Sequence, residues 1–173
     1  MKRILIAAVL ALTGLQAKAT ETERTQNDNK APAWACTMNF KGTTEGIRLI
    51  VGFYHLEGQG ELSCISASGA RAEYPILVKM KASPLTPGIS LGKMTLIGVA
   101  TNFSLFNLDP DAILGKYIVA QGQAAIVGGV GVMTAVHTDF PAVAMNVSVQ
   151  FAKGFGINLG LSKMEISVDN SRL

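Results

Sequence analysis

Apolar and polar residues alternate along most of this chain, and this period of two limits its fold more than any other feature. In the clearest run, one face is wholly apolar and consists of Val143, Met145, Val147, Val149 and Phe151. The other face carries Ala144, Asn146, Ser148 and Gln150. A helix would scatter these apolar residues around its circumference, so the pattern predicts a half-buried β-strand.

Two further runs alternate in the same way. One consists of Ile47, Leu49, Val51 and Phe53. The other consists of Ala72, Tyr74, Ile76, Val78 and Met80, with Arg71, Glu73, Lys79 and Lys81 pointing outward. Turn signals rich in Gly and Pro separate such runs at 57–61, 68–70, 83–88, 139–142 and 153–156. Antiparallel strands with one wet face are the expected result.

These signals predict an all-β fold, an antiparallel barrel or sandwich of about eight or nine strands. We expect the strands at 33–39, 46–54, 60–67, 71–81, 89–101, 115–125, 129–137, 142–152 and 155–168. One short helical turn is expected at 107–114, where Asp109 precedes Pro110. Gly128 and Gly129 favour a hairpin.

The last expected strand changes the parity of its apolar residues. The first set is Phe155, Ile157, Leu159 and Leu161, and the second is Met164, Ile166 and Val168. An extra residue in a strand reverses the faces of all residues after it, so we expect a β-bulge near Ser162 and Lys163.

The first residues have the pattern of a secretory signal peptide. Lys2 and Arg3 precede an apolar run, and Ala17-Lys18-Ala19 supplies the small residues of a cleavage site. We therefore expect a signal peptide at 1–19, a polar disordered leader at 20–32 and a single β domain at 33–173. Cleavage near Ala19 predicts a periplasmic or secreted protein.

Charge gives no indication of a nucleic-acid partner. Three of the fifteen basic residues, Lys2, Arg3 and Lys18, belong to the expected signal peptide, which leaves twelve basic against twelve acidic residues. The mature chain is therefore close to neutral, without the basic stripe typical of proteins that bind nucleic acid.

Several stretches carry a resemblance. They are a W-x-C pattern, "GIRLIVG", a second cysteine in "ELSC", "GKYIVAQGQAAIVGGVGV" and "VSVQFAKGFGINLGLSKMEI". Over residues 34–166 the chain resembles a family of small exported bacterial proteins known as a domain of unknown function. The stretch "GGVGVMTAVHTD" is similar to the SYLF lipid-binding domain. The first resemblance implies no activity, and the second implies lipid as a ligand.

Both cysteines, Cys36 and Cys64, lie at the ends of strand-like runs. An exported chain meets an oxidising compartment, and neither cysteine belongs to a C-x-x-C motif or has a neighbouring histidine. We therefore predict a structural disulfide, not a redox or metal site. Closing this loop is expected to stabilise the fold by about 3 kcal/mol.

The segment "GISLG" fits the G-x-S-x-G motif with Ser90 as nucleophile, and Asp109, Asp111 and His137 follow in the order of α/β-hydrolases. The residues after Ser90 continue a strand, whereas a nucleophile elbow requires a helix there. His55 and His137 are the chain's two histidines, too few for a zinc site without carboxylates. "GFGINLG" misses the dinucleotide-binding spacing. We expect no catalytic, metal-ligating or cofactor-binding residue.

Phe103 and Phe106 lie in an apolar stretch beside the longest irregular loop, which makes them the candidate ligand mouth. The expected function is that of a soluble, non-catalytic envelope protein. Its expected partners are a lipid or apolar small molecule, an envelope component, or a membrane contacted peripherally. A small outer-membrane β-barrel and a periplasmic enzyme of unknown class remain alternatives. The sequence does not indicate an oligomeric state.

Overall fold

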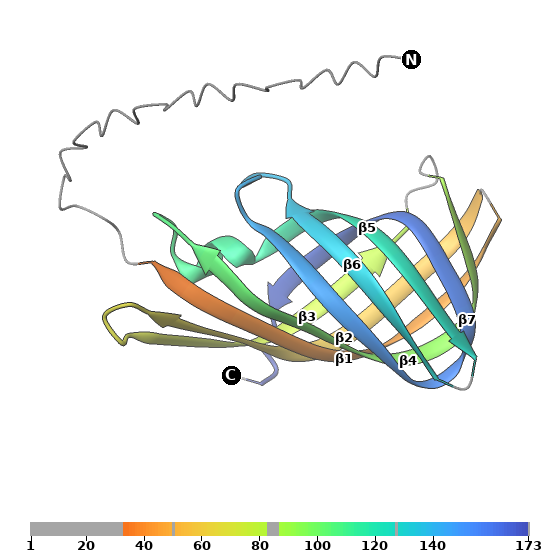
Figure 1. Ribbon diagram of the computed structural model, residues 1–173, viewed down its shortest axis with the longest axis horizontal. Coiled ribbons are helices and arrows are strands. Elements are labelled where there is room, and N and C mark those ends of the chain that lie inside the picture. The colour runs from red at the N-terminus through yellow and green to blue at the C-terminus, as the bar shows by residue number, and fades with distance from the viewer. Residues whose placement is uncertain (1–32, 50, 83–86, 127, 173) are drawn as a thin grey trace, which may run out of the picture.

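The computed structural model describes residues 33–49, 51–82, 87–126 and 128–172, which form one closed antiparallel sheet (Figure 1). Its strands are β1 (Trp34–Leu49), β2 (Val51–Ser66), β3 (Arg71–Lys81), β4 (Gly88–Leu105), β5 (Gly115–Ile126), β6 (Gly129–His137) and β7 (Ala144–Val168). A single 3-10 turn, η1 (Pro110–Ile113), lies between β4 and β5. The predicted all-β fold is confirmed. The expected signal peptide 1–19 and leader 20–32 lie outside the described residues.

Strand β7 closes the sheet, because it pairs with four other strands. The strand order is β3-β2-β1-β4-β7-β5-β6, and β7 also pairs with β3 and β6. Residues near its start lie between β4 and β6, its middle lies between β4 and β5, and its end lies between β5 and β3. In Figure 1, β7 curves in blue around one end of the barrel. It therefore occupies two places in the ring.

The two ends of the barrel differ. The disulfide end contains Cys36, Cys64 and η1, and the described chain begins and ends there (Figure 1). At the hairpin end, β1 ends at Leu49 and β2 begins at Val51, and β5 ends at Ile126 and β6 begins at Gly129. The predicted hairpin at Gly128 and Gly129 is confirmed, since Gly129 pairs with Ala125 across it.

An apolar core fills the barrel toward the disulfide end. The residues expected to face inward on β7 and just before it are buried: Val143, Met145, Val147, Val149 and Phe151. Of the inward residues expected on β3, Ile76, Val78 and Met80 are buried, and Ala72 and Tyr74 are half-buried against the core. Asn146, Ser148 and Gln150 are exposed, as expected. The alternation therefore assigns the faces correctly in this half of the molecule.

The expected turn at 57–61 is wrong, since these residues lie within β2. Its glycines lie where β2 passes close to β1. A Cβ atom at Gly58 would lie 3.0 Å from the ring of Phe40, which is buried on β1, and one at Gly60 would collide with the backbone oxygen of Asn39. Gly58 thus makes room for an aromatic ring and Gly60 for the neighbouring backbone, a use of glycine that resembles a turn signal in the sequence.

The expected strand at 46–54 is also wrong, because the chain turns in its middle. Leu49 ends β1, Val51 begins β2, and Ile47 pairs across the hairpin with Phe53. Ile47, Leu49 and Phe53 face outward and are 64%, 72% and 56% exposed. The alternation here belongs to two strands, and its apolar face is the outer one.

The bulge in β7 lies ten residues before the expected position. Thr95 pairs with Lys153 and Leu96 with Phe151, which leaves Ala152 without a partner on β4. No register shift accompanies Ser162 and Lys163 in the pairing with β5. Inward residues are therefore odd-numbered up to Phe151 and even-numbered afterwards, and the expected bulge at 162–163 is wrong. Two expected strands merge into β7 as a result.

Candidate binding surface

Polar side chains are buried together in the interior of the barrel toward the hairpin end, beside apolar ones such as Met94 and Phe151. This polar interior cluster consists of Thr44, Arg48, Ser90, Gln121, Gln123, Asn158 and Ser162, all 7% exposed or less. The strands β1, β4, β5 and β7 contribute these residues at inward positions. Polar groups in a protein interior are tolerated where they hydrogen-bond to one another, so their contacts decide what the cluster can do.

Hydrogen bonds link the members of the polar interior cluster across strands. The hydroxyl of Ser90 donates to Asn158 Oδ1 at 2.6 Å. Gln121 Nε2 donates to Ser162 Oγ at 2.7 Å, and Gln123 Nε2 donates to Gln121 Oε1 at 3.3 Å. The first bond joins β4 to β7, the second joins β5 to β7 and the third lies within β5, so the first two support the register of β7 after its bulge.

Arg48 supplies the charge of the polar interior cluster. Its Nη1 donates to the backbone oxygen of Leu161 at 3.4 Å. The guanidinium packs over Gly88, where a Cβ atom would lie 3.1 Å from Arg48 Cζ. Arg48 thus bridges the start of β4 and the middle of β7 from inside the barrel.

Other polar atoms of this region lack partners. Thr44 Oγ1 and Gln123 Oε1 are buried without a hydrogen-bond partner among the described residues. Burial raises the pKa of Tyr54, beside the cluster, above its ordinary value, and the Asn158 side chain opposes this effect in part. The interior of the hairpin end is therefore a costly environment for polar groups.

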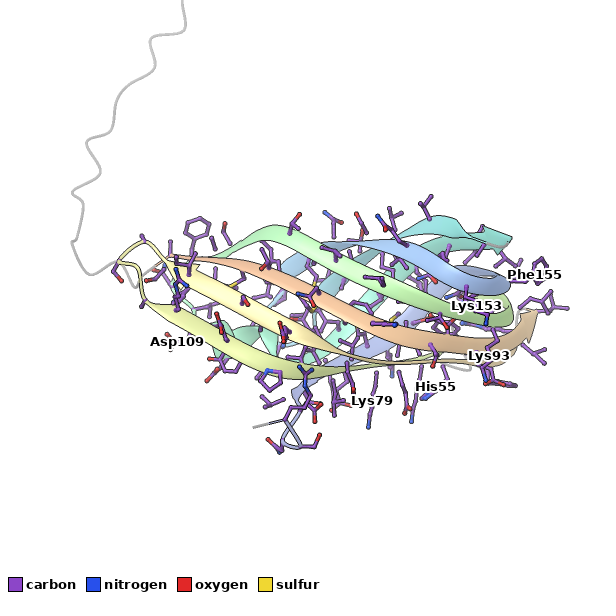
Figure 2. All side chains as sticks on the ribbon, turned by 90° about the horizontal axis from the view of Figure 1, so that it is seen from below. His55, Lys79, Lys93, Asp109, Lys153 and Phe155 are labelled. Carbon is purple, nitrogen blue, oxygen red and sulfur yellow. A yellow bond between two sulfur atoms is a disulfide. The ribbon has the colours of Figure 1, made fainter. Side chains whose placement is uncertain are left out.

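The outer surface of the same end is apolar. We define the outer apolar patch as Ile47, Leu49, Phe53, Ile89, Leu91, Phe155, Ile157, Leu159 and Leu161, which are all between 37% and 72% exposed. The pairing register makes its centre continuous: Ile47 lies opposite Leu91, which lies opposite Ile157. Figure 2 shows Phe155 pointing outward at this end. In soluble proteins, contiguous exposed apolar surface is typical of interaction sites.

Lysines border the outer apolar patch. Lys93 follows Leu91 on the outward face of β4, while Lys153 and Lys163 stand at the two ends of the apolar run on β7. Figure 2 shows Lys93 and Lys153 near Phe155, and Asp109 at the opposite end of the barrel. Lys93 Nζ lies 3.5 Å from Glu45 Oε2, with both side chains largely exposed. Solvent-exposed pairs of this kind contribute little to stability.

The predicted disulfide between Cys36 and Cys64 is confirmed. The two residues are direct partners on β1 and β2, their sulfurs are bonded, and their Cα atoms are 4.1 Å apart. Both are buried in the apolar core. The bond therefore joins neighbouring strands at the end of the barrel opposite the outer apolar patch.

The residues that resemble a hydrolase triad lie at different ends of the barrel. Ser90 is buried near the start of β4, where it contacts Asn158. Asp109 and Asp111 lie beside and within η1, and His137 ends β6 at the disulfide end. Strand β4 continues after Ser90 to Leu105, as expected, so the segment has no nucleophile elbow.

Hydrogen bonds and a ring contact hold His137 in place at the disulfide end. Its Nδ1 accepts hydrogen bonds from the backbone N–H groups of Asp139 and Phe140, both at 3.1 Å. Its Nε2 therefore carries the proton and donates to the Leu114 oxygen at 3.1 Å. The ring also meets that of Tyr117 edge-on. His137 thus fixes the loop after η1 against the end of β6.

The two candidate ligand-mouth residues, Phe103 and Phe106, lie in different environments. Phe103 is 8% exposed and belongs to the apolar core, whereas Phe106 is 70% exposed. Phe106 lies beside a hollow of about 350 Å³ whose lining does not include Phe103. His55 lies on the outer wall, with its Nε2 3.1 Å from Glu57 Oε1. Within the described ranges, no three His, Cys, Asp or Glu side chains gather as a metal site.

A scan against protein-family models found no match, and searches of curated proteins and of solved structures found no significant match. The resemblances to a domain of unknown function and to the SYLF domain therefore stay predictions. Among the described residues, no helix is long and apolar enough to cross a membrane.

The sequence reasoning missed both the polar interior cluster and the outer apolar patch. A signal was present in β7, where Gly156, Asn158, Gly160 and Ser162 alternate with large apolar residues. Small and polar residues at every second position leave room and hydrogen-bonding groups inside a narrow barrel. The same pattern is equally consistent with an ordinary strand whose apolar face points inward.

Proposed function

We propose that this chain is an exported, non-catalytic binding protein whose partner contacts the outer apolar patch. One observation carries the proposal: the hairpin end is polar inside and apolar outside, the reverse of a water-soluble barrel. Ser90 and Asn158 are 2% and 1% exposed, whereas their strand neighbours Leu91 and Ile157 are 46% and 37% exposed. Covering a large apolar side chain contributes about 1.5–3 kcal/mol, which gives binding at this patch its driving force.

The interior supports this proposal over an apolar-ligand carrier. Side chains such as Phe40, Leu56 and Leu96 pack together in the apolar core. A hollow of about 460 Å³ lies instead on the outer wall, among Lys41, Glu57 and other residues. An apolar ligand would therefore meet the barrel from outside.

The polar interior cluster does not favour the enzyme alternative. Apart from Arg48, its members are hydroxyls and amides, which do not form an acid–base pair. Ser90 donates its proton to an amide oxygen, which does not activate a nucleophile. A binding role therefore fits the described residues better than a catalytic one.

An outer-membrane barrel is the second candidate, because a polar interior and an apolar exterior are typical of that class. The outer wall of β2 and β3 opposes it. Glu57, Glu61, Glu73 and Lys79 face outward there and are all exposed, so the apolar surface covers only part of the circumference. The partial coverage favours contact at one end of the barrel over a complete span.

Substitution within the outer apolar patch tests the proposed function. Leu91 and Ile157 are cross-strand neighbours, and the double variant Leu91→Ser, Ile157→Ser makes the centre of the patch polar. Binding of the purified protein to dodecyl maltoside micelles, measured by co-elution, is expected to fall at least tenfold. The matched control is Ile97→Ser with Val99→Ser. Both residues lie on β4 outside the patch and are 40% and 37% exposed.

The comparison of these two variants decides the proposal. Equal micelle binding by the wild type and the Leu91→Ser, Ile157→Ser variant would refute it. Native mass spectrometry adds a second readout, since a lipid retained equally by both proteins would place the ligand inside the barrel. Strict recovery of the protein in the detergent-extracted membrane fraction would favour the outer-membrane alternative.

A further inference from the structure

We infer that the hairpin end docks on the surface of an anionic lipid bilayer. The outer apolar patch enters the interfacial region, and Lys93, Lys153 and Lys163 contact lipid phosphates. This inference rests on the proposed function and names the partner of the same surface. It is carried by the position of charge around the patch.

The apolar patch is too short to cross a bilayer. Its longest run, from Phe155 to Leu161 on β7, covers about 20 Å along the strand at roughly 3.3 Å per residue. Barrel strands are inclined by about 40°, so the run spans roughly 15 Å along the axis. This is about half of the 30 Å hydrocarbon core. The dimensions suit entry into one leaflet.

Lysines occupy the outward positions that border the patch on β4 and β7. Lys93 comes two residues after Leu91, Lys153 two residues before Phe155, and Lys163 two residues after Leu161. All three are exposed on the face that carries the patch. A lysine can bury its methylene stem against apolar surface and keep its ammonium group at the headgroup level. Basic residues around an apolar surface are typical of binding to anionic lipids.

At the opposite end of the barrel, exposed carboxylates outnumber the exposed cations Arg71, Lys116 and Arg172. The exposed carboxylates toward the disulfide end are Glu61, Glu73, Asp109, Asp111 and Asp139. An anionic bilayer attracts the lysine-bordered end and repels the acidic end, so this charge distribution orients the barrel with its hairpin end toward the membrane. Figure 2 shows this separation, with Asp109 far from Lys93 and Lys153.

A second copy of the chain fits the patch less well than a lipid surface does. In a symmetric contact, each patch would face its own equivalent. The lysines bordering one patch would then approach the lysines bordering the other, and such like-charge contacts are costly. Lipid phosphates supply the opposite charge. A second copy is therefore one outcome of the test.

Flotation of the mature chain with vesicles tests the inference. Vesicles of phosphatidylcholine alone are compared with vesicles containing 30% phosphatidylglycerol. We expect binding to the anionic vesicles and its loss at about 1 M salt, where the Debye length is about 3 Å. The variant Lys93→Gln, Lys153→Gln should bind about 25-fold more weakly, at about fivefold for each lysine. The matched control Arg71→Gln, Arg172→Gln removes two charges toward the acidic end and should bind like the wild type.

Tryptophan substitutions report which end meets the lipid. Phe155 at the hairpin end is 59% exposed and Phe106 at the disulfide end is 70% exposed. Spectra are taken as differences from the wild type, which contains one tryptophan. The emission of Phe155→Trp should shift to the blue with anionic vesicles and be quenched by brominated lipid. Phe106→Trp should show neither change.

Three outcomes overturn the inference. They are the absence of flotation with anionic vesicles, binding that Lys93→Gln, Lys153→Gln leaves unchanged, and a patch-dependent doubling of molecular mass in solution. The third would assign the patch to a second copy. Each leaves the proposed function standing if Leu91→Ser, Ile157→Ser still abolishes micelle binding. Failure of the micelle experiment refutes the proposed function itself, so the two failures are distinguishable.

Discussion

Ser90 and Leu91 are consecutive residues of β4 whose environments are reversed: the serine is 2% exposed inside the barrel and the leucine is 46% exposed outside it. The serine hydroxyl is satisfied by Asn158, and the leucine lies beside Ile47 and Ile157 on the outer wall. These two residues illustrate the reversed arrangement of the hairpin end, in which polar side chains lie inside and apolar side chains lie outside.

The first prediction concerns this pair. Ser90→Ala removes a buried donor and leaves Asn158 Oδ1 unpaired, so it should lower the free energy of unfolding by about 1–3 kcal/mol. Leu91→Ser changes an exposed side chain and should alter that free energy by less than about 0.5 kcal/mol. Urea denaturation measures both. A larger loss for Leu91→Ser would contradict the assigned faces.

The second prediction concerns the other half of the barrel, where the usual arrangement holds. Val147→Asp would place an unpaired charge in the apolar core, since Val147 is 1% exposed, and should abolish folding. Ser148→Lys, at the next outward position, should be nearly silent. Circular dichroism and thermal melting distinguish the two variants. A folded Val147→Asp protein would show that this face does not line the core.

The third prediction concerns the disulfide. Replacing both Cys36 and Cys64 with Ala should lower stability by about 3 kcal/mol, because the unfolded chain loses a constraint. Micelle binding at the opposite end should be unchanged. The non-reduced folded protein should contain no thiol that reacts with maleimide, and labelling of both cysteines would refute the bond.

The fourth prediction concerns alkaline pH. Burial raises the pKa of both Tyr54 and Tyr117, and a hydrogen bond with Asp111, together with burial and the charges of Asp111 and Asp109, raises that of Tyr74 to about 12. The unfolded chain ionises first, near pH 10. The stability is therefore fully present below pH 10 and is lost as the pH rises above it, by about 1.4 kcal/mol per pH unit for each buried tyrosine.

Denaturation at pH 9, 10 and 11 measures this loss. In Tyr54→Phe, the free energy of unfolding should fall less steeply with pH, by the contribution of one buried tyrosine. Tyr74 is partly exposed, so solvent screening makes its contribution smaller. A free energy of unfolding that stays constant from pH 9 to pH 11 would contradict the assignment of buried, neutral tyrosines.

The fifth prediction concerns two glycines. A Cβ atom at Gly98 would collide with the ring of Phe40, so Gly98→Ala should cost about 1–3 kcal/mol through overpacking. At Gly122 the same atom would lie 3.5 Å from Leu159 Cδ2, an ordinary contact, so Gly122→Ala should be tolerated. Thermal melting compares the two. Equal effects would show that Phe40 does not occupy the space above Gly98.

The sequence predicted the all-β class, the disulfide, β3, the β5–β6 hairpin and the inward face of β7 up to Phe151. Each of these depends on local patterns, such as alternation, a glycine pair or a pair of cysteines in an exported chain. The inward face of β7 was predictable because Val147 and Val149 alternate with Asn146 and Ser148 around an interior that is apolar.

The hairpin end could not be predicted in this way, since alternation gives two faces without saying which is inside. Near Leu159 the usual rule chooses the wrong face, because the interior there is filled by Arg48, Gln121 and other polar groups from distant strands. The sequence places the bulge wrongly for the same reason: the change of apolar parity near Ser162 reflects a change of environment, not a change of backbone register. The inversion of environment and the position of the bulge both depend on long-range pairing.

The alternation of faces makes the length of β7 as important as its composition. Deleting Ala152 would leave Phe151 and Lys153 opposite the consecutive residues Leu96 and Thr95, so every face would be kept and only the bulge lost. Deleting a residue between Phe155 and Leu161 would instead exchange the two faces of everything that follows, sending Lys163 inward and Met164 and Ile166 into solvent. No single substitution could have so broad an effect. Drift in side-chain identity is therefore tolerable along this strand in a way that a one-residue insertion or deletion after the bulge is not, and any protein descended from the same ancestor should keep the spacing between Lys153 and Met164 even where the residues themselves have changed.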